Sequence, residues 1–144
     1  MYQLVWSDVW LLMAILMGNA NEGVSLKSII ANGDGINHAI FTHAELESGF
    51  CRLTNSNLIL EKDGLFFPTS KANEIFKKVN DENKTMKDAW DILESTLNSK
   101  PYTPKKVEVG DCKYDGYSIS DVDKAIEEYK KEFELEMEKY RNGN

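Results

Sequence analysis

The chain lacks any apolar run long enough to cross a bilayer. The longest such run, Val9–Met17, has nine residues, whereas a membrane-spanning helix needs about 20. No Lys or Arg precedes Lys27, so the positive segment that opens a signal peptide is missing too. We therefore expect a buried first helix in a cytoplasmic protein that has no membrane partner.

Proline and cysteine are scarce. Three prolines and nine glycines fit neither a collagen-like nor a proline-rich low-complexity chain. The two cysteines, Cys51 and Cys112, have no CxxC partner, which excludes a zinc or redox motif with that spacing. We expect two reduced thiols in the cytoplasm, and a single disulfide between them stays open as the alternative.

Basic residues are outnumbered by acidic ones, 17 to 24, and the net charge is −7. No dense stripe of Lys and Arg occurs in positions 1–80, although a sequence-independent affinity for DNA requires one. The hydrophobic share of 42% is too high for intrinsic disorder. A chain of this length buries enough surface to form a core without metals or disulfides.

Capping residues mark where helices begin, because their side-chain oxygens accept hydrogen bonds from the first turn. Gly and Asn mark helix ends, because they tolerate the left-handed conformation. The expected caps are Ser7, Ser25, Thr42, Thr69–Ser70, Thr85 and Ser120. The expected breaks are Gly18–Asn19 and a turn at Asn32–Gly35.

A β-hairpin is predicted between the third and fourth helices. Two β-prone runs, Leu58–Lys62 and Leu65–Phe67, flank Asp63–Gly64. Asp-Gly suits a tight hairpin turn in which both central residues have positive φ. We therefore predict a mainly α fold with a small β-hairpin.

No catalytic or metal-binding constellation emerges from the sequence. His38 and His43 lie on either side of a helix start, so they do not share one face as paired ligands would. Cys51 has no recognisable base partner. The segment Asn32–Gly35 lacks the Lys of a phosphate-binding loop and the final Glu of an EF-hand. We predict a non-enzymatic protein with no metal and no cofactor.

Three helices followed by a hairpin resemble a winged helix-turn-helix domain. The segment Ile36–Thr42, followed by Glu45–Leu46, resembles uncharacterised bacterial winged-helix-like proteins, in which a pattern N-x-A-I-x-T-x-x-E-L opens the third helix. The resemblance covers about residues 5–80 and implies a winged-helix domain there. Residues 81–144 would then form a helical extension, with a loop at 100–117 and a terminal helix at 120–141.

In DNA-binding proteins of this architecture the third helix enters the major groove and the wing contacts the backbone. With Leu46, Phe50 and Leu53 facing inward, the resemblance implies an outward set that could contact double-stranded DNA. Its members are His43, Ser48, Arg52, Asn55 and, at the wing tip, Lys62. Arg and Asn are the side chains that read guanine and adenine.

Two functions stay open at this stage. The first is a DNA-binding transcriptional regulator, which rests on the order of the elements. The second is a protein–protein interaction module that does not bind DNA. The net charge and the carboxylates of Glu45 and Glu47, early in the third helix, favour the second, because phosphate repels them.

The last helix carries an apolar stripe that can be interpreted in two ways. Its members recur every three or four residues: Val122, Ile126, Tyr129, Phe133, Met137 and Tyr140. The stripe either folds back on the core or, from Ile126 onward, pairs with its copy in a homodimer. The spacing nearly keeps a heptad, which permits the second reading.

Overall fold

The computed structural model describes residues 3–19, 21–80, 85–100, 112–114 and 116–142. The described part is mainly helical with one small hairpin, so the predicted fold class is confirmed. The elements are α1 (Trp6–Leu16), α2 (Leu26–Asn37), α3 (His43–Asn55), β1 (Ile59–Lys62), β2 (Leu65–Pro68), α4 (Ser70–Asn80), α5 (Met86–Leu97) and α6 (Ile119–Arg141). Among these helices none is long and apolar enough to cross a membrane.

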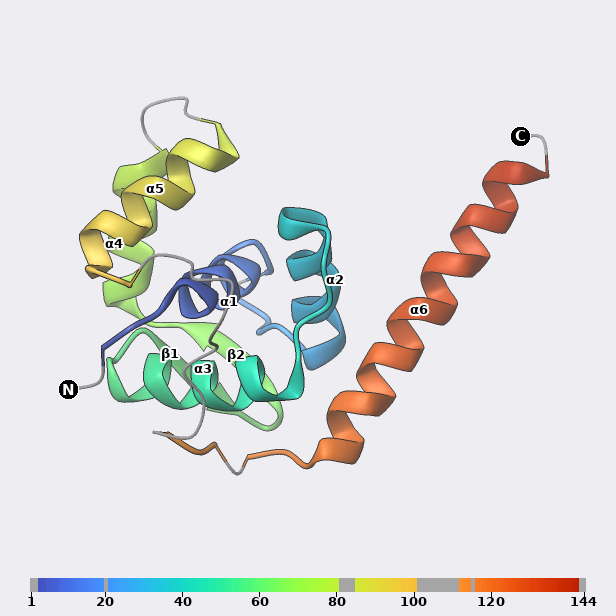
Figure 1. Cartoon of the computed structure of the whole chain (residues 1–144), viewed down its shortest axis with the longest axis horizontal. Coiled ribbons are helices and arrows are strands. Elements are labelled where there is room, and N and C mark those ends of the chain that lie inside the picture. Colours follow the sequence, from blue (N-terminus) through green and yellow to red (C-terminus); the bar gives the residue numbers. More distant parts are fainter. Residues whose placement is uncertain (1–2, 20, 81–84, 101–111, 115, 143–144) are drawn as a thin grey trace.

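Helix α1 is the centre of the core. Every residue from Ser7 to Leu16 is buried, and α2, α3 and α5 all contact the helix (Figure 1). The helix begins two residues earlier than its sequence suggests, because Val5 and not Ser7 is the N-cap. Asp8 accepts a hydrogen bond from the backbone N–H of Val5 at 2.9 Å, which satisfies a donor that the helix start leaves unpaired.

The predicted turn at Asn32–Gly35 is wrong, because α2 continues through it to Asn37. Three of its four residues have a distant partner. The Asn32 side chain donates to Ala14 O at 2.9 Å, and Trp10 Nε1 donates to Gly33 O at 2.9 Å. Asp34 accepts from the Tyr129 hydroxyl at 2.6 Å. Tertiary contacts therefore override the weak local helix preference of this segment.

The predicted caps and the hairpin turn are confirmed at several positions. Thr42 accepts from Glu45 N at 3.1 Å while the Glu45 side chain accepts from Thr42 N at 2.9 Å. A reciprocal pair also opens α5, at Thr85. Asp63 and Gly64 both have positive φ, 54° and 79°. The turn therefore joins β1 and β2 as an antiparallel pair with Lys62 opposite Leu65.

The last two helices contact the body formed by the earlier elements. On α5, Ala89 and Leu93 pack against Val9 and Met13 of α1. On α6, Val122 enters the main core, and the first half of the helix lies along α2. The second half stretches away from all other helices in Figure 1. The predicted loop 100–117 falls largely on residues 101–111 and 115, which are outside the described residues.

Candidate functional site

Helix α3, which the sequence predicts to enter a DNA groove, is enclosed over most of its length. From Leu46 to Leu53 every residue except Glu47 is buried. Two aromatic side chains from the segment before α6 lie against it. The rings of Tyr114 and Tyr117 are each 5.6 Å from the ring of Phe50. A helix covered in this way presents no continuous face to a groove.

Arg52 points into the core, so the prediction that it faces outward is wrong. Its side chain is 0% exposed, and its Nε donates to Asp8 Oδ2 at 2.8 Å. The pair joins α3 to the first turn of α1. The sequence did not predict this ion pair because its two residues are 44 positions apart. Helical spacing predicts only which residues of one helix are neighbours.

The other predicted contact residues are separated in space and differ in exposure. Ser48 is buried, which contradicts its predicted outward position. His43 is half-buried, with Nδ1 3.9 Å from Glu47 Oε2. Asn55 is exposed at the far end of α3, where its amide donates to Cys51 O at 2.9 Å. Lys62 is exposed at the hairpin. The five residues do not form one outward surface.

Cys51 and Cys112 are joined by a disulfide, which corrects the expectation of two reduced thiols. Their Cα atoms are 5.7 Å apart, well within the range that a disulfide can bridge. The Asn55 amide lies 3.6 Å from Cys112 Sγ. The bond ties the segment that carries Tyr114 and Tyr117 to α3.

The two tyrosines also contact β1 and the first residue of α3. Tyr114 donates its hydroxyl to Glu61 Oε1 on β1 at 2.9 Å. Tyr117 stands edge-on to the ring of His43 at 6.3 Å. Burial raises the pKa of the Tyr117 hydroxyl, and the nearby Glu47 carboxylate adds to the shift. Tyr117 therefore stays uncharged at neutral pH and acts as a packing residue.

The predicted stripe on α6 divides into two parts. Ile126 packs on the core, and Tyr129 donates to Asp34 of α2. Burial raises the pKa of Tyr129 to about 12, with a further contribution from this hydrogen bond. Lys27 of α2 and Glu132 form an exposed ion pair at 2.7 Å. The first half of the stripe thus lies against α2.

The second half of the stripe is open to solvent. Phe133 is 53% exposed, Met137 40% and Tyr140 86%. These three residues are spaced four and three apart, so they share one face of the helix. Leu135 is 59% exposed and lies on the opposite face. An apolar face of this kind on a projecting helix is typical of an interaction surface.

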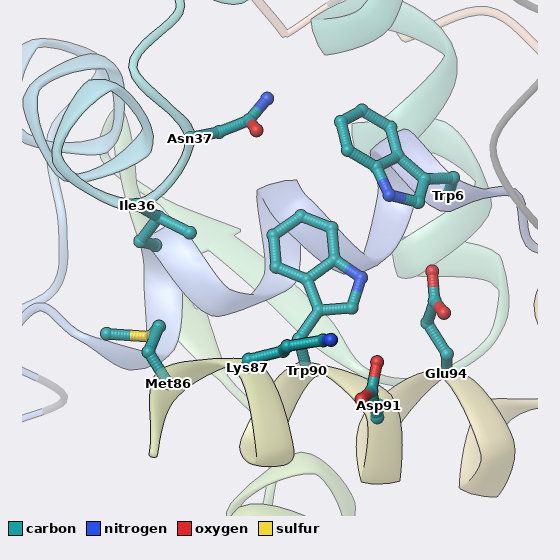
Figure 2. A pocket seen from close by; sticks show the side chains of 8 residues that line it. All are labelled: Trp6, Ile36, Asn37, Met86, Lys87, Trp90, Asp91 and Glu94. Carbon is teal, nitrogen blue, oxygen red and sulfur yellow. The ribbon is translucent and has the colours of Figure 1, made fainter.

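A pocket of about 450 Å³ lies between the start of α1, the end of α2 and α5. Figure 2 shows the described residues that line it: Trp6, Ile36, Asn37, Met86, Lys87, Trp90, Asp91 and Glu94. The two indole rings are 5.3 Å apart with their planes tilted by 37°. Sequence reasoning did not find this pocket, because its parts come from three separate helices.

Comparison with protein-family models, with curated proteins and with solved structures gave no match. Within the described ranges, no group of three or more His, Cys, Asp or Glu side chains is arranged to hold a metal ion.

Proposed function

We propose that this chain is a non-enzymatic interaction protein that pairs with a second copy of itself through the projecting half of α6. The observation that carries the proposal is the exposure of Phe133, Met137 and Tyr140 on one face of that helix. The projecting half of α6 lies away from the other helices (Figure 1), and a helical segment without tertiary contacts is only marginally stable in water. Burial of this face against a partner would stabilise the helix and remove apolar surface from solvent.

A second copy suits this surface because the projecting segment is electrically balanced. Residues 130–141 contain four basic and four acidic side chains, although the whole chain has a net charge of −7. Two such segments can therefore approach without the repulsion that the rest of the chain would cause. The nearly heptad spacing of the stripe also permits helix pairing.

Sequence-specific reading of DNA by α3 is disfavoured. The guanidinium of Arg52 is engaged with Asp8 in the interior, and the segment of Tyr114 and Tyr117 covers the helix. Exposure of α3 would require that segment to leave. We therefore favour the interaction module over the DNA-binding regulator.

Sedimentation equilibrium over a range of protein concentrations tests the pairing. We expect a reversible dimer for the parent chain, and a shift to monomer for Phe133→Ser with Met137→Ser. The matched control is Leu135→Ser, which removes an equally exposed side chain from the opposite face and should leave the dimer intact. A parent chain that stays monomeric at millimolar concentration would refute the proposal.

Fluorescence anisotropy on a labelled duplex at about 20 to 200 mM salt tests the DNA part separately. A protein with about four phosphate contacts shows a log–log slope near −3.6. We expect no binding at the lowest salt. Binding with such a slope would restore the DNA-binding regulator.

A further inference from the structure

The pocket between α1, α2 and α5 is walled by two tryptophans. Trp6 and Trp90 are both half-buried and form a bent aromatic surface on one side of it (Figure 2). The face of an indole ring carries negative partial charge and attracts cations, and tryptophan is the strongest of the aromatic side chains in this respect. The wall is therefore suited to a flat or compact positively charged group.

Two carboxylates lie beside this wall on α5. Glu94 is four residues from Trp90 and three from Asp91, so it neighbours both on the surface of the helix. Figure 2 shows the side chains of Asp91 and Glu94 rising from α5 on the same side as Trp90. Among the described residues that line the pocket, Lys87 is the one that is cationic. The charged groups of the lining are therefore negative on balance.

Glu94 has an acceptor with no partner among the described residues. Its Oε1 atom is buried and makes no hydrogen bond there. A buried acceptor without a donor is unfavourable, and few native groups remain in that state. Because Glu94 lines the pocket, its carboxylate is suited to a ligand with an N–H group. A purely apolar ligand would leave it unpaired, and an anion would be repelled by both carboxylates.

We propose that this pocket binds a guanidinium group. A guanidinium is planar, so it stacks on an indole face, and it donates several N–H bonds in its plane to carboxylates. A quaternary ammonium would fit the aromatic wall but has no N–H for Glu94. The group belongs either to a free small molecule or to an arginine side chain of a peptide.

The test uses the full chain labelled with ¹⁵N and follows the three indole N–H signals by NMR. The first probe is N-acetyl-arginine amide. We expect the Trp6 and Trp90 signals to shift during the titration. Trp10 is the internal control, because its Nε1 is engaged with Gly33 O in the core. The citrulline counterpart has nearly the same shape without the charge, and we expect it to cause no shift.

Matched variants test which side chains of the pocket contribute to binding of the probe. Glu94→Gln should weaken binding about tenfold, as expected for loss of a charge-assisted hydrogen bond. Glu74→Gln, a control on the exposed surface of α4, should change nothing. Lys87→Met should tighten binding about threefold, because it removes a competing cation. An unchanged Trp10 signal in each variant shows that the fold is retained.

Three results would overturn the proposal. They are no shift at millimolar probe, equal shifts with the citrulline compound, and equal weakening by Glu94→Gln and Glu74→Gln. A tripeptide Gly-Arg-Gly that binds more tightly than the amide supports the site and assigns a peptide ligand. Equal affinities support the site and assign a free compound. Binding should be unchanged in Phe133→Ser with Met137→Ser, since the pocket does not depend on α6.

Discussion

The buried ion pair between Asp8 and Arg52 connects the first turn of α1 to α3. The two side chains are fully buried and bond at 2.8 Å. Asp8 also accepts the hydrogen bond from Val5 N at the helix start. One carboxylate therefore both caps a helix and neutralises a buried cation.

We expect Arg52→Met to destabilise the fold by about 3–5 kcal/mol, because it leaves the Asp8 carboxylate buried without its counter-ion. Urea unfolding followed by circular dichroism measures the change. The combined variant Asp8→Asn with Arg52→Met should be more stable than Arg52→Met alone. No charge is then left at this pair, and the Asn side chain can still accept the hydrogen bond from Val5 N. If Arg52→Met unfolds like the parent chain, the pair has no structural role.

The elements differ in how far their own residues specify them. The capping boxes at Thr42 and Thr85 and the Asp63–Gly64 turn involve residues within three positions of each other. Such local hydrogen bonds and turn conformations can be predicted from sequence. Helix α2 differs, because its last turns contain two glycines and end with His38 in a left-handed conformation.

Gly33 and Gly35 form a matched pair for a test of α2. A Cβ at Gly33 would collide with the ring of Phe41, which stacks on Trp10 with centroids 3.8 Å apart. A Cβ at Gly35 would meet nothing within 4 Å. Gly33 therefore allows the close contact of α2 with the core, whereas Gly35 has no such role.

We expect Gly35→Ala to stabilise the protein by about 0.5–1 kcal/mol, because alanine loses less backbone entropy in a helix. Gly33→Ala should destabilise it by about 1–3 kcal/mol through overpacking against Phe41. Thermal unfolding of both variants measures the difference. Equal changes in the two midpoints would contradict the assigned role of Gly33.

At the scale of the whole molecule, the disulfide links α3 to the segment that covers it. Cys51 and Cys112 are 61 positions apart in the sequence. The bond holds Tyr114 and Tyr117 over α3, where both rings contact Phe50. The covering segment and α3 thus form one unit in the oxidised protein.

Cys112→Ser should lower stability by up to about 4 kcal/mol, because the open chain gains loop entropy in the unfolded state. Denaturant unfolding measures this loss. Hydrogen exchange of the α3 amides should also become faster as the covering segment loosens. Reduction of the parent chain should reproduce both effects, whereas Ser56→Ala, a control near the end of α3, should show neither. Unchanged exchange in α3 after reduction would indicate that side-chain packing alone holds the segment.

The sequence by itself determined the order of helices, the hairpin and the caps at Ser25, Thr42 and Thr85, because these depend on residues a few positions apart. The caps predicted at Ser7 and Ser120 are wrong, because Val5 and Ser118 take those places. Only the tertiary structure decided that Arg52 is internal, that Asn32–Gly35 is helical and that Cys51 meets Cys112. The partners in these cases are 44 positions away for Arg52, 18 for Asn32 and 61 for Cys51. Helical periodicity shows which side chains share a face, but packing between distant segments decides whether that face is exposed.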